Sequence, residues 1–470
     1  MNKISRRDFL RGTAAGAVMM AMGMTIPTVA FAEEETYDLG GVTLTVLNQS
    51  NIADLNPNAE GLEEYQVAER QEKLDAIQEK YNVVLEFVDL PTGDWDDEAA
   101  EIVSAYASGN PVADIMDAYY QFAGTYIANG ILYDFSEDFA SNDVFNESYY
   151  FTWMSKQWGL STGIGGEGLY YNKTWVQELG MQYTPAEMFD MGLWSYDDCY
   201  NYMLEMKSYL AEDEYPLFVS PYYWMLFATA ANGEIILDTS GNLNYCSDAF
   251  LESLEFFAKC LSDGLIAPAP QTESGYDTWS YPGSTFDAGN TLVMAHRAAW
   301  QASYISAGFE LGFVPYPWGT NVTIESTGNS GDYLTLSDNY AATYYDGQLL
   351  CLTEGIQDKA DPMIVMQMVA EWMGWDGAFV GYEAEENDNT SCGWLEDGLD
   401  KDLYFYSLSI ERLEPFNSLD LDLNLAPNAT MYGGGSIRSA MESYYNQDMA
   451  LMIDAGYASE DVYTPYDVEE

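Results

Sequence analysis

The amino-acid sequence predicts an α/β protein with at least two domains. Segments rich in β-branched residues alternate with segments whose apolar residues recur at helical spacing, over most of the chain. The chain has 470 residues, which is more than one hydrophobic core usually organises. Apolar residues make up 48% of it and aromatic residues 15%, so a folded chain is predicted despite a formal net charge of −60.

The first elements are predicted in the order strand, helix, strand. Residues 42–47 and 83–88 are rich in β-branched and aliphatic side chains, which is typical of strands. Between them, apolar residues from position 67 to position 81 fall at helical spacing. This order suggests a parallel βαβ unit. A helix at residues 98–108, ended by a glycine, and a short strand at residues 113–116 are predicted next.

The second half of the chain continues the alternation. Strands are predicted at residues 169–171, 311–315 and 349–352, and helices at residues 175–179, 195–210, 250–261 and 361–372. Two of these helices carry clear start signals, because Ser195 and Asp198 form a capping-box pattern and Asp361 precedes Pro362. Residues 383–400 and the glycines at 433–435 are predicted to lie in long polar loops.

The first 32 residues are predicted to be an export signal. Arg6 and Arg7 are paired, an apolar run follows from Gly12, and residues 30–32 form a small-residue cleavage site. The paired arginines indicate the twin-arginine route. Because the first cysteine is Cys199, we expect no lipid anchor after the signal, and a protein of the periplasm or cell surface. An uncleaved membrane anchor is the alternative, but the apolar run is short for a spanning helix.

Composition excludes several classes of function. Only 16 Lys and Arg face 76 Asp and Glu, which excludes nucleic acid and anionic membrane surfaces as partners. The single histidine, His296, removes most of the material for zinc sites and Ser-His-Asp chemistry, so no catalytic residue, metal or cofactor is expected. The acidity is interpreted mainly as solubility and self-repulsion, with attraction of a cationic ligand as the alternative.

The five cysteines are too few for a disulfide scaffold. Cys246 and Cys260 flank one predicted helix, whose length would separate them by roughly 20 Å, beyond the reach of a disulfide. We therefore expect mostly free, buried thiols.

Six short segments follow one another in a characteristic order. They are residues 107–115 with Asp114-Ile115, 122–135 with Gly130-Ile131-Leu132, 168–173 with Tyr171-Asn172-Lys173, 194–198, 286–300 and 312–317. In this order they resemble the extracellular solute-binding proteins of bacterial carbohydrate ABC transporters, the family of maltose-binding protein. The segment at 289–294 is one residue longer than the family pattern and lacks its lysine, and no correspondence is found beyond Trp375.

The resemblance implies a two-lobed periplasmic-binding-protein fold (type II) with a ligand cleft between the lobes. It places lobe 1 at residues 37–180 plus about 352–400, and lobe 2 at residues 181–348 plus about 401–470. The chain would then cross between lobes near residues 180–185 and 349–355. The implied function is that of a monomeric, non-enzymatic protein that captures a sugar or oligosaccharide and delivers it to the permease of an ABC transporter.

Sugars are bound by aromatic rings and by carboxylates or amides. With 12 Trp and 38 Tyr, most aromatic side chains are expected to pack in cores, so we choose candidates by position. Two positions end the first strand, three follow the Asp114-Ile115 strand, three match second-lobe stacking segments of the family, and two lie by the second crossing. The expected ligand-binding residues are Asn48, Gln49, Tyr119, Tyr120, Gln121, Tyr222, Trp224, Trp300, Tyr345 and Asp346.

Two other functions stay open at this point. An exported glycosidase needs two carboxylates that flank a sugar, and a chain with 76 acidic residues leaves room for such a pair. The same fold with an acidic cleft could instead bind a polyamine or a cationic peptide, in which case binding would depend strongly on salt.

Overall fold

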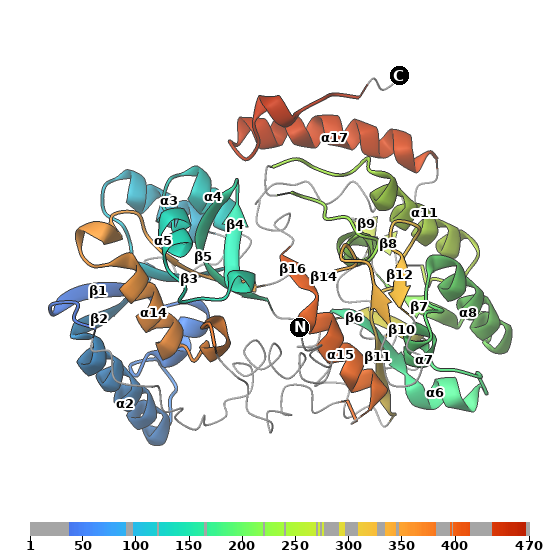
Figure 1. The fold of residues 1–470 in the computed structure, drawn as a ribbon, viewed down its shortest axis with the longest axis horizontal. Coiled ribbons are helices and arrows are strands. Elements are labelled where there is room, and N and C mark those ends of the chain that lie inside the picture. Colours follow the sequence, from blue (N-terminus) through green and yellow to red (C-terminus); the bar gives the residue numbers. More distant parts are fainter. Residues whose placement is uncertain are drawn as a thin grey trace.

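Two α/β lobes, each with its own sheet, make up the protein. The computed structural model describes residues 37–90, 97–119, 122–163, 167–219, 221–238, 241–268, 271–272, 275–276, 291–296, 309–326, 334–344, 347–381, 395–396, 398–413 and 435–466. Figure 1 shows the lobes side by side, with helix α17 (Ile437–Asp454) lying along one side of the molecule. Within these ranges, no helix is both long and apolar enough to cross a membrane.

Lobe 1 is organised by a six-stranded sheet with the order β2-β1-β3-β15-β5-β4. Its strands are β1 (Val42–Leu47), β2 (Val83–Val88), β3 (Ile115–Tyr119), β4 (Tyr150–Trp153), β5 (Lys156–Gly163) and β15 (Gly347–Leu352). Strand β1 pairs in parallel with β2 and β3, which confirms the predicted βαβ unit. Strand β15 comes from far along the chain and pairs antiparallel with both β3 and β5.

Helices cover the sheet of lobe 1. They are α2 (Glu64–Tyr81), α3 (Glu98–Ala107), α4 (Ala123–Ala128), α5 (Ser136–Ser141) and α14 (Pro362–Trp372), with the 3₁₀ turns η2 (Ser50–Leu55), η4 (Glu147–Tyr149), η7 (Ile356–Asp358) and η8 (Asp376–Ala378). Helix α2 buries only Leu74, Ile77 and Tyr81, so one narrow stripe attaches it to the lobe. The Tyr81 hydroxyl donates to Glu371 of α14 at 2.7 Å and ties the two helices together.

Lobe 2 has a four-stranded sheet with the order β11-β6-β10-β7. The strands are β6 (Gly168–Asn172), β7 (Tyr215–Phe218), β10 (Thr291–His296) and β11 (Leu311–Val314). A Cβ atom at Gly312 would lie 2.2 Å from the Tyr171 ring, so only glycine leaves room for this ring against strand β11. The Asp400 carboxylate accepts hydrogen bonds from the Tyr171 hydroxyl and the Phe313 amide, and it forms an ion pair with Lys173 at 3.1 Å.

The helices of lobe 2 include the one that was predicted to begin after Ser195. They are α6 (Lys173–Glu178), α7 (Pro185–Asp190), α8 (Tyr196–Tyr209), α9 (Pro221–Tyr223), α10 (Thr229–Ala231), α11 (Asp248–Ser262) and α15 (Leu399–Ser409), with the π-helical turn η5 (Trp224–Ala228) and, near the C-terminus, η10 (Glu460–Val462). Ser195 and Asp198 form the capping box of α8. In lobe 1, the Asp361 side chain caps α14 ahead of Pro362, as the sequence also predicted.

Three short strand pairs complete the fold. They are β8 (Gln271–Thr272) with β9 (Gly275–Tyr276), β12 (Ile324–Ser326) with β13 (Thr335–Leu336), and β14 (Ala342–Tyr344) with β16 (Glu411–Leu413). The last pair is parallel, so the segment that leads into β15 runs beside the segment that follows α15.

The passages between lobes lie earlier in the chain than expected. Strand β5 ends at Gly163 in the first sheet and β6 begins at Gly168 in the second, so the expected first crossing at 180–185 was wrong. The Tyr-Tyr-Asn-Lys strand was assigned to lobe 1, but its pairing with β10 and β11 puts it in lobe 2. In the second passage the chain returns from β14 to β15 of lobe 1, slightly before the expected residues 349–355. Helix α15 packs on β11 and α7, so it belongs to lobe 2.

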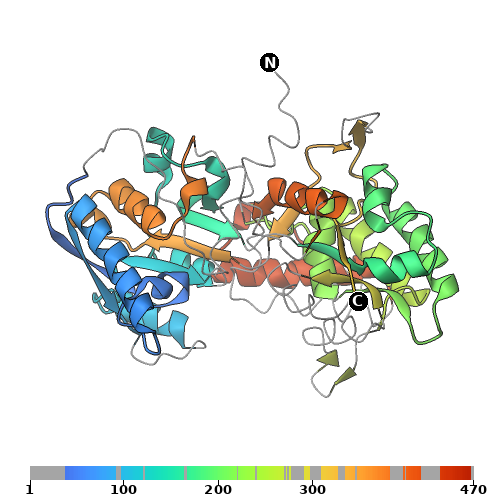
Figure 2. The same ribbon diagram turned by 90° about the horizontal axis from the view of Figure 1, so that it is seen from below.

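The C-terminal segment touches both lobes. Arg438, at the start of α17, forms an ion pair with Asp248 of α11 at 3.0 Å. Beyond the end of α17, the Tyr457 hydroxyl lies 3.3 Å from Oγ1 of Thr125 in α4 of lobe 1. Figures 1 and 2 both show α17 reaching from lobe 2 toward lobe 1. A Cβ atom at Gly241 of lobe 2 would meet both Tyr457 O at 2.4 Å and Met154 Sδ of lobe 1 at 3.2 Å.

The described cysteines are free thiols, as predicted. Cys199, Cys260 and Cys351 are buried and Cys246 is half-buried. The fifth cysteine, Cys392, lies outside the described residues.

Candidate functional site

Polar side chains gather where the parallel strands of lobe 1 end. Strand β3 ends at Tyr119, opposite Gln348 at the start of β15, and Gly347 pairs with Gly163 at the end of β5. Both passages to lobe 2 therefore leave from this edge of the sheet. The carboxyl ends of strands in open α/β sheets are common ligand positions, which makes this edge the candidate site.

A tight turn at the start of η2, just after β1, presents three polar residues at this edge. Ser50 adopts a left-handed conformation with φ of 54°, which reverses the chain directly after Gln49. The backbone amides of Asn51 and Ile52 then donate to Oδ2 of Asp117 in β3, at 3.0 and 3.3 Å. The Asn51 side-chain amide donates to Oε1 of Gln348. We call residues 49–51 the first-lobe turn.

A second carboxylate lies beside the turn. Gln49 Nε2 donates to Glu98 Oε1 of α3 at 2.8 Å, and the Tyr126 hydroxyl donates to the same oxygen at 3.4 Å. Three further oxygens near the turn are buried and accept no hydrogen bond within the described part of the chain: Gln49 Oε1, Ser50 Oγ and Asp117 Oδ1. Most of the polar atoms here are acceptors, so the cluster suits a partner that donates hydrogen bonds.

The electrostatics of this cluster follow from burial. Burial raises the pKa of Asp117 to about 7, although hydrogen bonds from Ile52 and Asn51 pull that pKa down. Burial also raises the pKa of Glu98, and the hydrogen bonds from Gln49 and Tyr126 offset part of the increase. In the described ranges, no Lys or Arg forms an ion pair with either carboxyl group. The cluster therefore has no built-in positive charge for an anionic ligand.

The structure places three of the predicted site residues at this edge. Gln49 belongs to the first-lobe turn. Asn48 precedes it, and its side chain donates to Asp89 at 2.5 Å and accepts from Asn56 at 3.0 Å, so most of its hydrogen-bonding capacity is used locally. Tyr119 ends β3 and is half-buried.

Trp224 is a correction to the predicted ligand set. It is fully buried in η5, its indole N–H donates to the Ser253 carbonyl at 2.8 Å, and its ring stacks on Phe256 with centroids 5.5 Å apart. Because the ring faces are covered by other side chains, Trp224 packs the core of lobe 2 and offers no face to a sugar. The Pro-Tyr-Tyr-Trp pattern begins a continuous helical segment, and the Trp of this pattern points into the core of lobe 2.

The predictions for the other ligand-binding residues stay predictions. Tyr222 belongs to α9. The predictions for Tyr120, Gln121, Trp300, Tyr345 and Asp346 fall outside the described residues.

Five residues of the cluster were missed in the sequence. They are Ser50, Asn51, Glu98, Asp117 and Gln348. One signal could have found Asp117, because a lone carboxylate in an otherwise apolar strand needs hydrogen-bond partners. Gln348 becomes part of the cluster only through the pairing of β15 with β3, which no local pattern predicts.

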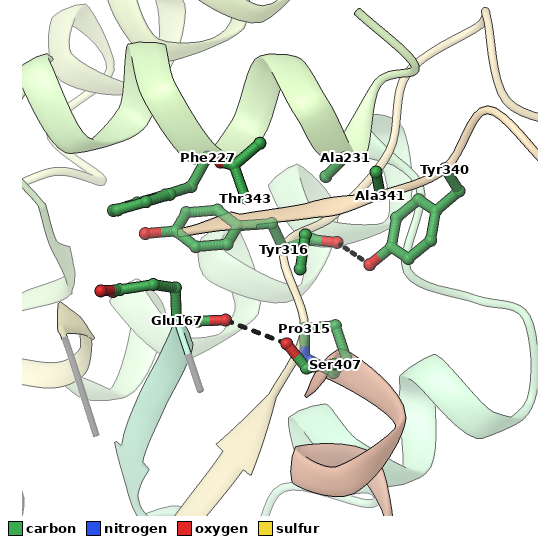
Figure 3. A pocket seen from close by; sticks show the side chains of 10 residues that line it. Glu167, Phe227, Ala231, Pro315, Tyr316, Tyr340, Ala341, Thr343 and Ser407 are labelled. Atoms are coloured by element: carbon green, nitrogen blue, oxygen red, sulfur yellow. Dashed lines mark hydrogen bonds between the residues drawn. The ribbon is translucent and has the colours of Figure 1, made fainter. Parts of the chain in front are cut away.

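A small pocket lies in lobe 2, next to both passages (Figure 3). It is lined by Glu167, Phe227, Ala231, Pro315, Tyr316, Tyr340, Ala341, Ala342, Thr343 and Ser407. The Tyr340 hydroxyl donates to the Tyr316 carbonyl at 2.8 Å, and the Ser407 hydroxyl donates to the Glu167 carbonyl at 3.2 Å. These hydrogen bonds link the segments that line the pocket. The space holds about one water molecule, so this pocket is too small for a sugar in this arrangement.

The sequence comparisons identify the family and the export signal. Residues 73–361 match the model of the bacterial extracellular solute-binding protein family. Residues 3–23 match the signal sequence of the twin-arginine translocation pathway, as predicted. The comparison with curated proteins finds no match.

Solved structures share the fold over most of the chain. The sugar-binding protein MalE from Xanthomonas citri is 13% identical, covers 88% of this chain and 98% of its own, and has a TM-score of 0.58. The cyclic α-maltosyl-1,6-maltose binding protein from Arthrobacter globiformis is 15% identical, covers 88% and 100%, and has a TM-score of 0.57. UgpB from Mycobacterium tuberculosis, solved with glycerophosphocholine, is 13% identical, covers 89% and 99%, and has a TM-score of 0.53.

At these identities the likeness concerns the fold, and it confirms the predicted two-lobed α/β architecture. The matched segment spans the greater part of the chain, from α2 of lobe 1 to the start of α14. The chain belongs to the bacterial extracellular solute-binding protein family and carries a twin-arginine export signal.

Proposed function

We propose that this protein captures a neutral sugar or oligosaccharide between its lobes and delivers it to the permease of an ABC transporter. Several structures with this fold are sugar binders by name, including those from Xanthomonas citri and Arthrobacter globiformis. The fold alone does not select sugars, because the structure of UgpB was solved with glycerophosphocholine. The ligand class must therefore be argued from the residues of the site.

The acceptor-rich cluster of lobe 1 is the observation that carries the proposal. Gln49 Oε1 and Ser50 Oγ are buried in the turn without hydrogen-bond donors from the described residues. Sugar hydroxyls supply such donors. An anionic ligand would face the carboxyl groups of Glu98 and Asp117 without a compensating cation from the described residues, and an ionised carboxylate about 6 Å from an anion repels it by about 3 kcal/mol at an effective dielectric constant near 20.

A polyamine or cationic peptide is the second candidate, because the same carboxylates and the net charge of −60 would attract it. The two ligand classes differ in their response to salt. Binding of a cation to exposed acidic groups weakens as the Debye length falls from about 10 Å at 0.1 M salt to about 3 Å at 1 M. Hydrogen bonding to a neutral sugar changes little over the same range.

We infer that the protein binds its ligand without hydrolysing it. The family and the structural neighbours are binding proteins. A glycosidase needs two carboxyl groups open to the glycosidic bond, whereas Glu98 is 4% exposed and Asp117 is fully buried. Incubation with oligosaccharides should therefore leave them intact, and appearance of shorter products would contradict this inference.

We further propose that the exported chain works as a monomer in the periplasm or at the cell surface. Its twin-arginine signal supports export of a folded protein. The first cysteine is Cys199, deep in lobe 2, which supports an exported chain without a lipid anchor next to the signal. Membrane fractionation and size-exclusion chromatography of the native protein test both points.

A thermal-shift screen tests the ligand class. The panel contains maltose, maltotetraose, other neutral oligosaccharides, spermidine, amino acids and glycerophosphocholine. A ligand at one hundred times its Kd stabilises the native state by about 2.7 kcal/mol, which raises the melting temperature measurably. We expect at least one neutral sugar to do so in both 0.1 and 1 M salt. A response to spermidine alone, lost in high salt, would contradict the proposal.

Matched variants connect the response to the site. Gln49→Ala removes an amide of the first-lobe turn and should weaken or abolish the sugar response. Gln71→Ala removes a surface amide of α2 that donates to Asp75 of the same helix, so it should leave the response unchanged. An equal response in the two variants would remove the first-lobe turn from the site.

A further inference from the structure

Asp117 is an unusual residue for its place in the fold. It occupies the middle of β3, between the buried side chains of Met116 and Ala118, and its own side chain is 0% exposed. A carboxylate in such surroundings destabilises the fold unless hydrogen bonds compensate for the lost water. The neighbours of Asp117 in the strand are buried and apolar, so the bonds that its side chain makes call for a separate explanation.

Among the described residues, the side-chain hydrogen bonds of Asp117 reach the first turn of η2. Its Oδ2 accepts from the backbone amides of Asn51 at 3.0 Å and Ile52 at 3.3 Å. Amides at the start of a helical turn have no partner within that turn. Ser50, the residue before them, is held in the left-handed region with φ of 54°, a conformation that a non-glycine residue keeps only when its surroundings fix it.

The same turn is linked to the rest of the site. Asn51 donates through its side chain to Gln348, which lies on β15 close to the second passage between the lobes. Gln49, on the other side of Ser50, donates to Glu98 of α3. Asp117 thus anchors the backbone at the end of the first-lobe turn, and the side chains of Gln49 and Asn51 link that turn to different elements of lobe 1.

We propose that Asp117 is the positioning residue of the first-lobe site: its buried carboxylate fixes the backbone of the first-lobe turn and so holds Gln49, Ser50 and Asn51 in the arrangement that meets the ligand. This inference rests on the proposed function for its ligand, but its geometric core can be tested without one. Asp117 acts through the turn and does not itself contact the ligand.

Hydrogen exchange measured by mass spectrometry on the full exported chain provides the test. Asp117→Asn keeps a side-chain oxygen that can accept both amides, and Asp117→Leu and Asp117→Val keep an apolar strand but no acceptor. We expect the peptide covering residues 47–56 to exchange at nearly the wild-type rate in Asp117→Asn. In the two apolar variants its slow amides should exchange at least about tenfold faster, because the amides of Asn51 and Ile52 lose their buried side-chain acceptor.

Two controls separate positioning from general stability. Ser161→Ala changes another buried polar side chain of the same sheet, in β5, and should leave the turn peptide unchanged. Peptides from β3 and from α8 of lobe 2 should keep their protection in every variant. If all lobe 1 peptides accelerate together, or if Asp117→Asn loses protection as fully as the apolar variants, Asp117 is only a structural residue and the inference is wrong.

Maltotetraose serves as the probe for the ligand step. We expect Asp117→Asn to retain the wild-type rise in melting temperature and the apolar variants to lose it. If the wild-type protein itself does not respond to maltotetraose or to another sugar, the proposed function fails while the exchange result still decides the role of Asp117. Apolar variants with unchanged exchange in the turn peptide would overturn the inference whatever the sugar result.

Discussion

The contact between the C-terminal segment and lobe 1 predicts how the lobes move. The Tyr457 hydroxyl meets Thr125 Oγ1 at 3.3 Å, and Met154 of the β4–β5 turn lies beside the same segment. Met154 lies just before strand β5 (Lys156–Gly163), and the first passage follows the end of that strand. At a rise of about 3.3 Å per residue, β5 is about 23 Å long, so the contact lies about that far from the passage. A rotation of about 10° at the passage would move it by about 4 Å, which breaks a hydrogen bond.

Removing this hydrogen bond should therefore change the populations of lobe arrangements. Tyr457→Phe deletes one neutral hydrogen bond, which contributes about 1 kcal/mol. That energy corresponds to about a fivefold change in the ratio between the described arrangement and rotated ones. Tyr445→Phe is the matched control, because the Tyr445 hydroxyl bonds to Asn242 at 3.4 Å within lobe 2.

Electron–electron distance measurements between spin labels give the readout. Labels replace the exposed residues Glu72 of α2 and Glu205 of α8, one in each lobe, in a background without Cys246 and Cys392. We expect the distance distribution to broaden or shift in Tyr457→Phe and in Thr125→Val, and to match the parent in Tyr445→Phe. Identical distributions in all variants would refute the reasoning that this contact restrains the lobes.

Three further predictions concern stability. Burial raises the pKa of Asp117 to about 7 from 3.8. The protonated side chain therefore stabilises the fold fully below about pH 4, and this stabilisation, at most about 4 kcal/mol, is lost as the pH rises through 7. Asp117→Asn should flatten the slope of melting temperature against pH between 5 and 8. A steeper slope in that variant would contradict the assignment. Asp400→Ala should lower the free energy of unfolding by about 3–5 kcal/mol, because the Tyr171 hydroxyl and the Phe313 amide lose their buried acceptor, and urea unfolding measures this. Trp224→Phe should lower stability by about 2–3 kcal/mol yet leave the affinity for a sugar unchanged, whereas a large loss of affinity with little loss of stability would restore Trp224 to the ligand site.

Local signals in the sequence predicted the elements of this fold well. Alternating β-branched residues located β1 and β2, and the Ser195 and Asp361 caps located the starts of α8 and α14. These features depend on neighbours within a few positions along the chain, and such neighbours can be read directly. The order of family segments then predicted two lobes, which the fold comparison confirms.

Features that depend on distant pairing could not be predicted in the same way. The lobe boundary was misplaced because β6 pairs with β10 and β11, which lie more than a hundred residues away in the sequence. No local pattern within β6 predicts these partners. Gln348 joins the candidate site for the same reason. Trp224 was misassigned because an aromatic residue next to a turn looks the same in sequence whether its ring faces solvent or the core.

Difference hydrogen exchange with the sugar that most raises the melting temperature tests the central claim most directly. The claim is that the ligand meets the edge of lobe 1 where β1 and β3 end and β15 begins. We predict that the sugar slows exchange in peptides covering residues 47–56 and 347–352. Slowed exchange confined to residues that line the lobe 2 pocket, such as 340–343, with no change in the first-lobe turn, would contradict it.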